Sequence, residues 1–323
     1  MFFQLMLQPL SQKERLKSLF YAGSPSISHG LFWNNQENPE KTYHKTFDKL
    51  CITKKLDGDH MDFGIEGKSA IVTAASSGLG KASAMELAAE GARVMINARN
   101  AEKLTRAAEE IRGVTGQEVL ALAGDVTDEG FVHELIAATN RTLGAVDILV
   151  ANAGGPPAGF FDDFSADHYR DAVELNLIST INLCREAVPI MRERGWGRIV
   201  AITSIAAKQP VSNLILSNTA RAGVLGFMKS LSQQVAASGI TVNTLCPGYH
   251  LTERLKVLGA SASQKEEIGV DEVYARWAAS TPMNRIGDPR EFAAVVAFMC
   301  SERASYLTGT VTQVDGGAYQ ALI

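Results

Sequence analysis

The chain has 323 residues, of which 46% are hydrophobic and 20% are charged, and its formal net charge at pH 7 is -4. This composition is that of a globular protein with ample apolar material for a core. The small negative charge excludes a general attraction to nucleic acids or anionic membranes, and no apolar run approaches the ~20 residues that cross a bilayer.

The first 60 residues differ in character from the rest of the chain. They mix turn formers, aromatic residues and charges without a sustained period, although "SQKERLKSLF" is typical of a short amphipathic helix. The apolar start "MFFQLMLQPL" lacks a basic flank and a small-residue cleavage site, so it is a poor signal peptide. We predict that residues 1–60 form a peripheral, poorly ordered N-terminal extension; a targeting or partner-binding arm is the functional alternative.

From residue 61 onward the sequence reads as one domain, 61–323. Apolar runs rich in β-branched residues alternate with segments of helical period, and in chain order they read "SAIVTA", "RVMIN", "VLALAGDV", "VDILVAN", "GRIVAIT", "ITVNTL" and "GTVTQVDGG". Strands that are apolar nearly throughout are buried on both faces, as in a parallel sheet covered by helices. The rhythm therefore predicts an α/β fold with a doubly wound parallel sheet of Rossmann type, in a single domain.

The first predicted strand runs into a Gly-rich turn, "TAASSGLG", and then into a helical segment. Glycines at this place let the backbone turn tightly beside a pyrophosphate, at which the helix points its positive end. Ala74 stands where a glycine is more usual, so the turn must accept a methyl group. The turn predicts a dinucleotide site, a plain connection being the alternative. The predicted contacts are Thr73, Ser76, Ser77, Gly78, Leu79 and Gly80.

The second predicted strand ends in "VMINARN", where an acid that would bind the 2′-hydroxyl of an adenosine ribose is missing. Arg99 follows the strand instead, and an arginine accommodates a 2′-phosphate. The cofactor we predict is therefore NADP(H). Arg99 as a solvated helix-start residue is the alternative.

Several motifs follow in an order that resembles the short-chain dehydrogenase/reductase family over about residues 66–323. "TAASSGLG" is similar to its TGxxxGxG loop, "GDV" to the place where an aspartate meets adenine, and "ANAG" to its NNAG turn. "NTLCPGYHLT" resembles its PG…T segment, and "TGTVTQVDGG" its closing strand. The further cofactor contacts that the resemblance implies are Asp125, Val126, Asn152, Ala153, Gly154, Pro247, Gly248 and Thr252.

The resemblance also implies the catalytic residues, and there the chain departs from the family. "ELNLIST" contains the helix asparagine, Asn176, and "VAITSIA" the active-site serine, Ser204. Thirteen residues further on, the family has a tyrosine, and a lysine four residues later; this chain has Ser217 and Arg221. Those two lie one helical turn apart and can point into one pocket. The chain thus resembles a divergent, 3-oxoacyl-acyl-carrier-protein reductase-like branch with Ser and Arg at these positions.

The catalytic residues that remain can still stabilise an oxyanion. Ser204 can donate a hydrogen bond to it, and Arg221 can supply positive charge and bind ribose hydroxyls. Serine is too weak an acid to replace tyrosine, so the proton comes from water near Asn176 or from Tyr249, whose alternative role is that of a pocket wall.

We expect NADPH-dependent reduction of a carbonyl, such as that of a 3-oxoacyl thioester, to an alcohol. The rival hypothesis is a catalytically silent dinucleotide-binding protein that acts as a partner or sensor. Residues 253–286 are a long insertion and are expected to form a lid that determines the substrate.

The setting of this activity follows from the resemblance and from the cysteines and histidines. The resemblance implies a homodimer or homotetramer that uses the last helices and strand. The scattered cysteines (Cys51, Cys184, Cys246 and Cys300) and histidines predict no metal site and a reducing, cytoplasmic compartment.

Overall fold

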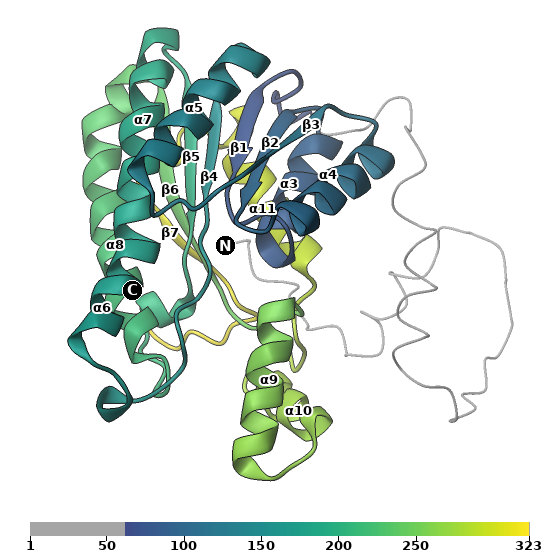
Figure 1. Cartoon of the computed structure of the whole chain (residues 1–323), viewed down its shortest axis with the longest axis vertical. Coiled ribbons are helices and arrows are strands. Elements are labelled where there is room, and N and C mark those ends of the chain that lie inside the picture. Colours follow the sequence, from purple (N-terminus) through teal and green to yellow (C-terminus); the bar gives the residue numbers. More distant parts are fainter. Residues whose placement is uncertain (1–61, 323) are drawn as a thin grey trace, which may run out of the picture. The chain divides into compact units, whose positions relative to one another are not determined.

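The computed structural model describes residues 62–322, so the predicted extension 1–60 and its amphipathic helix lie outside the described residues. The described chain contains one parallel seven-stranded sheet, in the order β3-β2-β1-β4-β5-β6-β7 (Figure 1). The prediction of a doubly wound parallel sheet is confirmed. The strands are β1 (Ser69–Val72), β2 (Arg93–Ala98), β3 (Val119–Ala123), β4 (Ile148–Ala151), β5 (Gly197–Ile202), β6 (Ile240–Pro247) and β7 (Val311–Val314).

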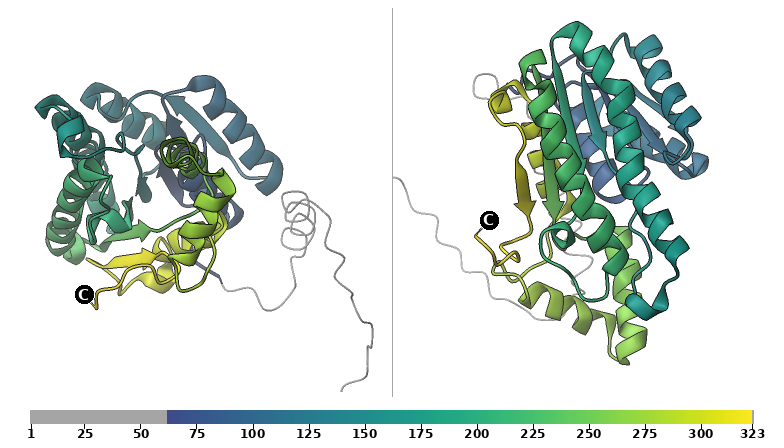
Figure 2. Two further views of the ribbon diagram at one scale, coloured as in Figure 1. Left: turned by 90° about the horizontal axis from the view of Figure 1, so that it is seen from below. Right: turned by 90° about the vertical axis from the view of Figure 1, so that its left-hand side faces the viewer.

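Helices cover both faces of the sheet, as Figure 2 shows. One layer consists of α3 (Gly78–Ala89), α4 (Ala101–Thr115) and α11 (Pro289–Met299). The other consists of α5 (Glu129–Leu143), α7 (Ser179–Arg194) and α8 (Ile215–Val235). The short helix α6 (Ala166–Val173) packs on α8.

Successive residues of a strand point to opposite faces, and this alternation divides the core into two clusters. Ala70 and Val72 of β1 pack under the α3 layer, whereas Ile71 between them packs under the α5 layer. All three are fully buried, which explains why the strands read as nearly continuous apolar runs.

The predicted lid consists of two helices, α9 (Glu253–Glu266) and α10 (Val270–Ala279), which project together from the carboxyl edge of the sheet (Figure 1). Gly259 of α9 lies against Tyr274 of α10; a Cβ at this glycine would come 2.6 Å from the tyrosine ring. A larger residue at 259 would therefore require the Tyr274 ring to move. Within residues 62–322, no helix is long and apolar enough to span a membrane.

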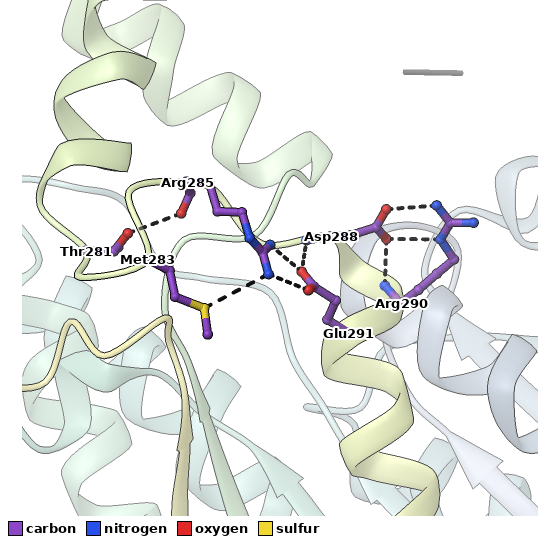
Figure 3. A network of polar contacts seen from close by, with 6 residues as sticks. All are labelled: Thr281, Met283, Arg285, Asp288, Arg290 and Glu291. Atoms are coloured by element: carbon purple, nitrogen blue, oxygen red, sulfur yellow. Dashed lines mark hydrogen bonds and ion pairs between the residues drawn. The ribbon is translucent and has the colours of Figure 1, made fainter. Parts of the chain in front are cut away.

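The chain returns from the lid to the sheet through a segment that is held by ion pairs (Figure 3). Arg285 donates from both Nη atoms to the carboxylate of Glu291, at 2.7 and 2.6 Å. Asp288 caps α11 by accepting a hydrogen bond from the amide of Arg290 at 2.8 Å, and Glu291 accepts one from the amide of Asp288 at 2.8 Å. This reciprocal arrangement satisfies amides that the helix itself leaves unpaired.

Replacing Asp288 by alanine should lower the free energy of unfolding by about 1 kcal/mol, because the first turn of α11 loses its side-chain acceptor. Urea unfolding followed by circular dichroism measures the change. Asp288→Asn is the control: it keeps the acceptor and loses only the ion pair with Arg290, so it should retain most of the stability. Equal losses in the two variants would assign the effect to the ion pair and contradict the capping argument.

Candidate active site

A cavity of about 630 Å³ lies at the carboxyl ends of the strands. It lies at the point where the strand order changes direction, since β1 has β2 on one side and β4 on the other. In open α/β sheets this switch point is where ligands bind. Its wall comes from the loops after β1, β2, β3, β4, β5 and β6, together with residues of α8 and α9.

The Gly-rich turn forms one wall of this cavity, with Ser76, Ser77, Gly78 and Leu79 in the lining. The helix α3 begins there without a side-chain cap from Ser77, so its first amides are available to an anion. Ala74 adopts φ of +47°, the left-handed region that usually favours glycine.

Two residues of the predicted cofactor set lie behind the cavity wall. Gly80 packs against the loops, because a Cβ there would come 2.4 Å from the carbonyl oxygen of Ala74. Thr73 is fully buried; its hydroxyl donates to the carbonyl of Asn152 at 2.7 Å and accepts from the amide of Asn152 at 2.9 Å. This pair joins the loops after β1 and β4, so that Asn152, Ala153 and Gly154 line the cavity.

Arg99, Asp125 and Val126 line the end of the cavity beside β2 and β3. The Arg99 guanidinium lies 3.7 Å from the Asp125 carboxylate and is largely exposed. Lys103, one turn further along, is also in the lining and was not among the residues that the sequence predicted. The available signal was its basic charge in the first turn of the helical segment that follows Arg99.

Ser204 and Ser217 line the opposite end of the cavity, at the carboxyl end of β5. The Ser204 oxygen accepts a hydrogen bond from the amide of Ala206 at 3.1 Å, which leaves its own hydroxyl proton available to a ligand. Ser217 is buried, and within the described part of the chain its hydroxyl makes no hydrogen bond.

Arg221 is 7% exposed and lies beside these serines in the cavity wall. Its Nη1 donates to the carbonyls of Ile202 and Thr203 at 3.2 and 3.0 Å, and its Nη2 to that of Ala153 at 3.3 Å. Burial, and then the charge of Arg254, lowers the pKa of Arg221 to about 10, so the group remains charged at neutral pH. No carboxylate of residues 62–322 forms an ion pair with it.

Asn176 lies behind the cavity wall, in a π-helical turn (Glu174–Ile178) that joins α6 to α7. Its Nδ2 donates to the carbonyl of Gly154 at 3.0 Å, and its Oδ1 is buried without a hydrogen-bond partner. Insertions of this kind in helices are frequent at functional sites, and a buried acceptor without a partner is costly unless a water or ligand reaches it.

Pro247, Gly248 and Thr252 line the cavity, and so does Tyr249. The Tyr249 ring stacks on Trp277 of the lid helix α10, with ring centroids 5.1 Å apart and planes 7° from parallel. Burial raises the pKa of Tyr249, which makes it a weaker acid than a free tyrosine. This packing favours the pocket-wall alternative for Tyr249.

Sequence reasoning missed several residues of the cavity lining. Arg254 of α9 contributes to it, with the apolar side chains of Leu175, Ile205, Val211, Leu214, Leu255 and Leu258. Apolar residues scattered through helices and loops carry no motif, so only the tertiary structure shows that they meet here. Within the described residues, no group of three or more His, Cys, Asp or Glu side chains is placed to hold a metal ion.

Comparisons with known proteins give a consistent result. The family model described as Enoyl-(Acyl carrier protein) reductase matches residues 73–319. The 3-oxoacyl-acyl-carrier-protein reductase of Vibrio cholerae is 35% identical over 255 residues, which cover 79% of this chain and 98% of that protein.

Two similar solved structures are those of L-sorbose reductase from Gluconobacter frateurii, complexed with NADPH and L-sorbose, and of actinorhodin polyketide ketoreductase with NADPH. The first has a TM-score of 0.78 at 33% identity and covers 81% of this chain and 100% of that one. The second has a TM-score of 0.75 at 34% identity and covers 78% of this chain and 97% of that one.

Proposed function

Because the chain belongs to the short-chain dehydrogenase/reductase family, we propose that it reduces a carbonyl to an alcohol with NADPH, at a site in which Ser217 and Arg221 stand where the family has tyrosine and lysine. One observation carries this proposal. The buried guanidinium of Arg221, which pairs with no carboxylate of residues 62–322, lies in the cavity wall beside two serine hydroxyls, where negative charge on a carbonyl oxygen would be stabilised.

The residues around the cavity fit a dinucleotide. The uncapped amides of α3 suit a pyrophosphate, and Arg99 and Lys103 suit a 2′-phosphate at the end of β2. When bound, NADPH supplies the hydride. That the two solved relatives contain NADPH supports this choice of cofactor.

Arg221 and Ser204 would act together on the carbonyl oxygen. A guanidinium has five N–H donors, and the three hydrogen bonds to backbone carbonyls leave the Nε–H and one Nη2–H of Arg221 free. The hydroxyl of Ser204 donates a hydrogen bond to the same oxygen. Removal of one such donor typically lowers kcat by about 100- to 1000-fold. Ser217 is too weak an acid to protonate the oxygen, so the proton comes from water.

A 3-oxoacyl thioester is the first substrate class to test, because the Vibrio cholerae relative is named for it. The L-sorbose of the Gluconobacter structure shows that similar chains accept other carbonyl compounds. A homodimer or homotetramer assembled through the last helices and strand remains our proposal for the oligomer.

A silent dinucleotide-binding protein is the second candidate, favoured by the serine at 217 and the raised pKa of Tyr249. Two measurements separate the candidates: NADPH binding by fluorescence, and substrate-dependent NADPH oxidation over a panel of ketones, aldehydes and 3-oxoacyl thioesters. We expect binding and oxidation, with the alcohol as product. If NADPH binds tightly and no carbonyl compound raises NADPH oxidation above the background rate, the silent dinucleotide-binding protein is favoured instead.

Arg99→Ala should weaken NADPH binding about tenfold and leave NADH binding unchanged, because it removes one charge-assisted contact to the 2′-phosphate. Adding Lys103→Ala should weaken NADPH binding further. Arg106→Ala is the control, since this arginine lies on α4 like Lys103, pairs with Glu102 and is outside the cavity lining. Equal losses for NADPH and NADH, measured by fluorescence titration, would contradict the assignment.

A further inference from the structure

The substrate end of the cavity contains two arginines, Arg221 and Arg254. The one carboxylate in the lining, within residues 62–322, is Asp125 at the far end, beside Arg99. The mutual repulsion of the two guanidinium groups contributes to the lowered pKa of Arg221. This end therefore has an excess of positive charge that the described protein does not neutralise.

Arg254 is not placed to stabilise its own helix. It lies in the first turn of α9, where the helix dipole disfavours a cation, and the cap of that helix is Thr252, whose Oγ1 accepts from the amide of Leu255. The neighbouring Glu253 pairs with Lys256 at 3.1 Å and does not compensate the arginine.

The Arg254 side chain instead reaches from the lid to the loop after β4. Its Nη2 donates to the carbonyl of Pro156 at 2.7 Å, and its guanidinium lies over Gly155, where a Cβ would come 3.2 Å from Nε and Nη2. Arg221 contacts the same loop at Ala153. Three residues span at most about 11 Å, so the two guanidinium groups lie beside one short backbone segment.

We propose that Arg254 binds a carboxylate of the substrate, so that the enzyme reduces oxo acids whose ketone lies within a few bonds of the acid group. This inference rests on the proposed reductase function. The keto carbon accepts the hydride from NADPH and the keto oxygen takes a proton from water, giving a hydroxy acid whose carboxylate is unchanged. Arg221 and Ser204 hold the ketone oxygen, while the leucines of the lining cover the apolar part of the molecule.

Two anions compete for this assignment, a substrate carboxylate and the cofactor pyrophosphate. Arg254 contacts the loop after β4 at Gly155 and Pro156. The amides that suit a pyrophosphate begin at Gly78 of α3, where Thr252, the cap of α9, lies 3.5 Å from the position of a Cβ. A carboxylate can accept two parallel hydrogen bonds from a guanidinium, which a neutral ester or thioester carbonyl cannot match. A pyrophosphate can accept the same pair of hydrogen bonds. The contact of Arg254 with the loop that Arg221 also contacts favours the substrate, and the NADPH affinity of Arg254→Met separates the two anions.

The test uses the full-length protein with NADPH and two ketones, 2-oxohexanoate and 5-oxohexanoate, each as the free acid and as its methyl ester. We expect kcat/KM for one of the acids to exceed that of its ester by about 10- to 100-fold, the range of a hydrogen bond to a charged group. Arg254→Met should abolish this preference, because it should lower kcat/KM for the acid by about 10- to 100-fold more than for the ester. Arg276→Met is the control, because this arginine lies on the same lid, pairs with Glu266 and is outside the cavity lining.

Equal rates for acid and ester in the wild type would overturn the inference. So would an Arg254→Met variant that loses NADPH affinity and slows both substrates alike, since Arg254 would then hold the pyrophosphate. If no ketone is reduced, the proposed reductase function fails for this panel, and calorimetry of the oxo acids with the NADP-bound protein still decides the inference. If an oxo acid binds to the wild type and no longer binds to Arg254→Met, the inference is supported. If neither acid binds to the wild type, the inference is overturned.

Discussion

Arg221→Ala is expected to lower kcat/KM by about 100- to 1000-fold, whereas Ser217→Ala should retain most of the activity. Arg221 supplies the charge and two free N–H donors beside Ser204, and Ser217 supplies only a neutral hydroxyl. Steady-state NADPH oxidation with the best substrate of the panel measures both variants. Equal rates in wild type and both variants, with NADPH still bound, would contradict an enzymatic role for this site.

The same side chain also supports the structure, so rate and stability must be measured together. Alanine would leave the carbonyls of Ile202, Thr203 and Ala153 without their donor, and each unpaired buried group costs about 1 to 3 kcal/mol unless water replaces the arginine. Arg221→Lys keeps the charge and part of the hydrogen bonding. It should therefore retain more activity than Arg221→Ala, and thermal melts of both variants show how much of any loss is due to unfolding.

The pH dependence distinguishes the guanidinium from other groups. With a pKa of about 10, Arg221 is charged at neutral pH, so its contribution should be constant up to about pH 9 and fall as the pH rises through 10. In Arg221→Lys the same burial acts on an ammonium with an ordinary pKa of about 10.4 and moves the decline to lower pH. An alkaline limb that is identical in the two proteins would exclude residue 221 as its origin.

The sequence predicted those parts of the molecule that depend on local pattern. Continuous apolar runs such as "DILVA" specify a strand buried on both faces, and the spacing of Ser217 and Arg221 places both on one helix face, where the structure shows them in the cavity wall. The alternation of strands and helices predicted a doubly wound parallel sheet, whereas the strand order is seen only in the structure, because doubly wound folds occur with more than one order.

The parts that the sequence did not predict depend on contacts between distant segments. Tyr249 stacks on Trp277, and Arg254 lies over Gly155; no local pattern connects the partners of either pair. The resemblance implied Asn176 as a catalytic residue, but no local pattern showed the π-helical turn that places it behind Gly154. Lid residues in particular are determined by how α9 packs across the cavity, which periodicity cannot specify.

Ser217→Tyr combined with Arg221→Lys should raise turnover by about 100- to 10,000-fold over wild type, the contribution that general acid catalysis typically makes. The phenol would start one helical turn from the ammonium, on the face of α8 that borders the cavity. A cation this close lowers the pKa of a phenol and makes it a stronger acid. The charge of Arg254 would act in the same direction. Tyr249 is a weaker acid, because burial raises its pKa.

Ser217→Phe with Arg221→Lys is the matched control, because it introduces the same ring without the acidic hydroxyl. If the missing acid is what limits the wild type, the tyrosine variant should exceed the phenylalanine variant by nearly the full factor, while both bind NADPH equally. If the two variants are equally slow, the missing acid is not what limits turnover in the wild type. The other residues of the cavity wall would then have to account for the slow rate. The apolar lining and Arg254 would then determine which carbonyl compound can approach at all, so the oxo acids should be tried on both variants before the site is regarded as silent.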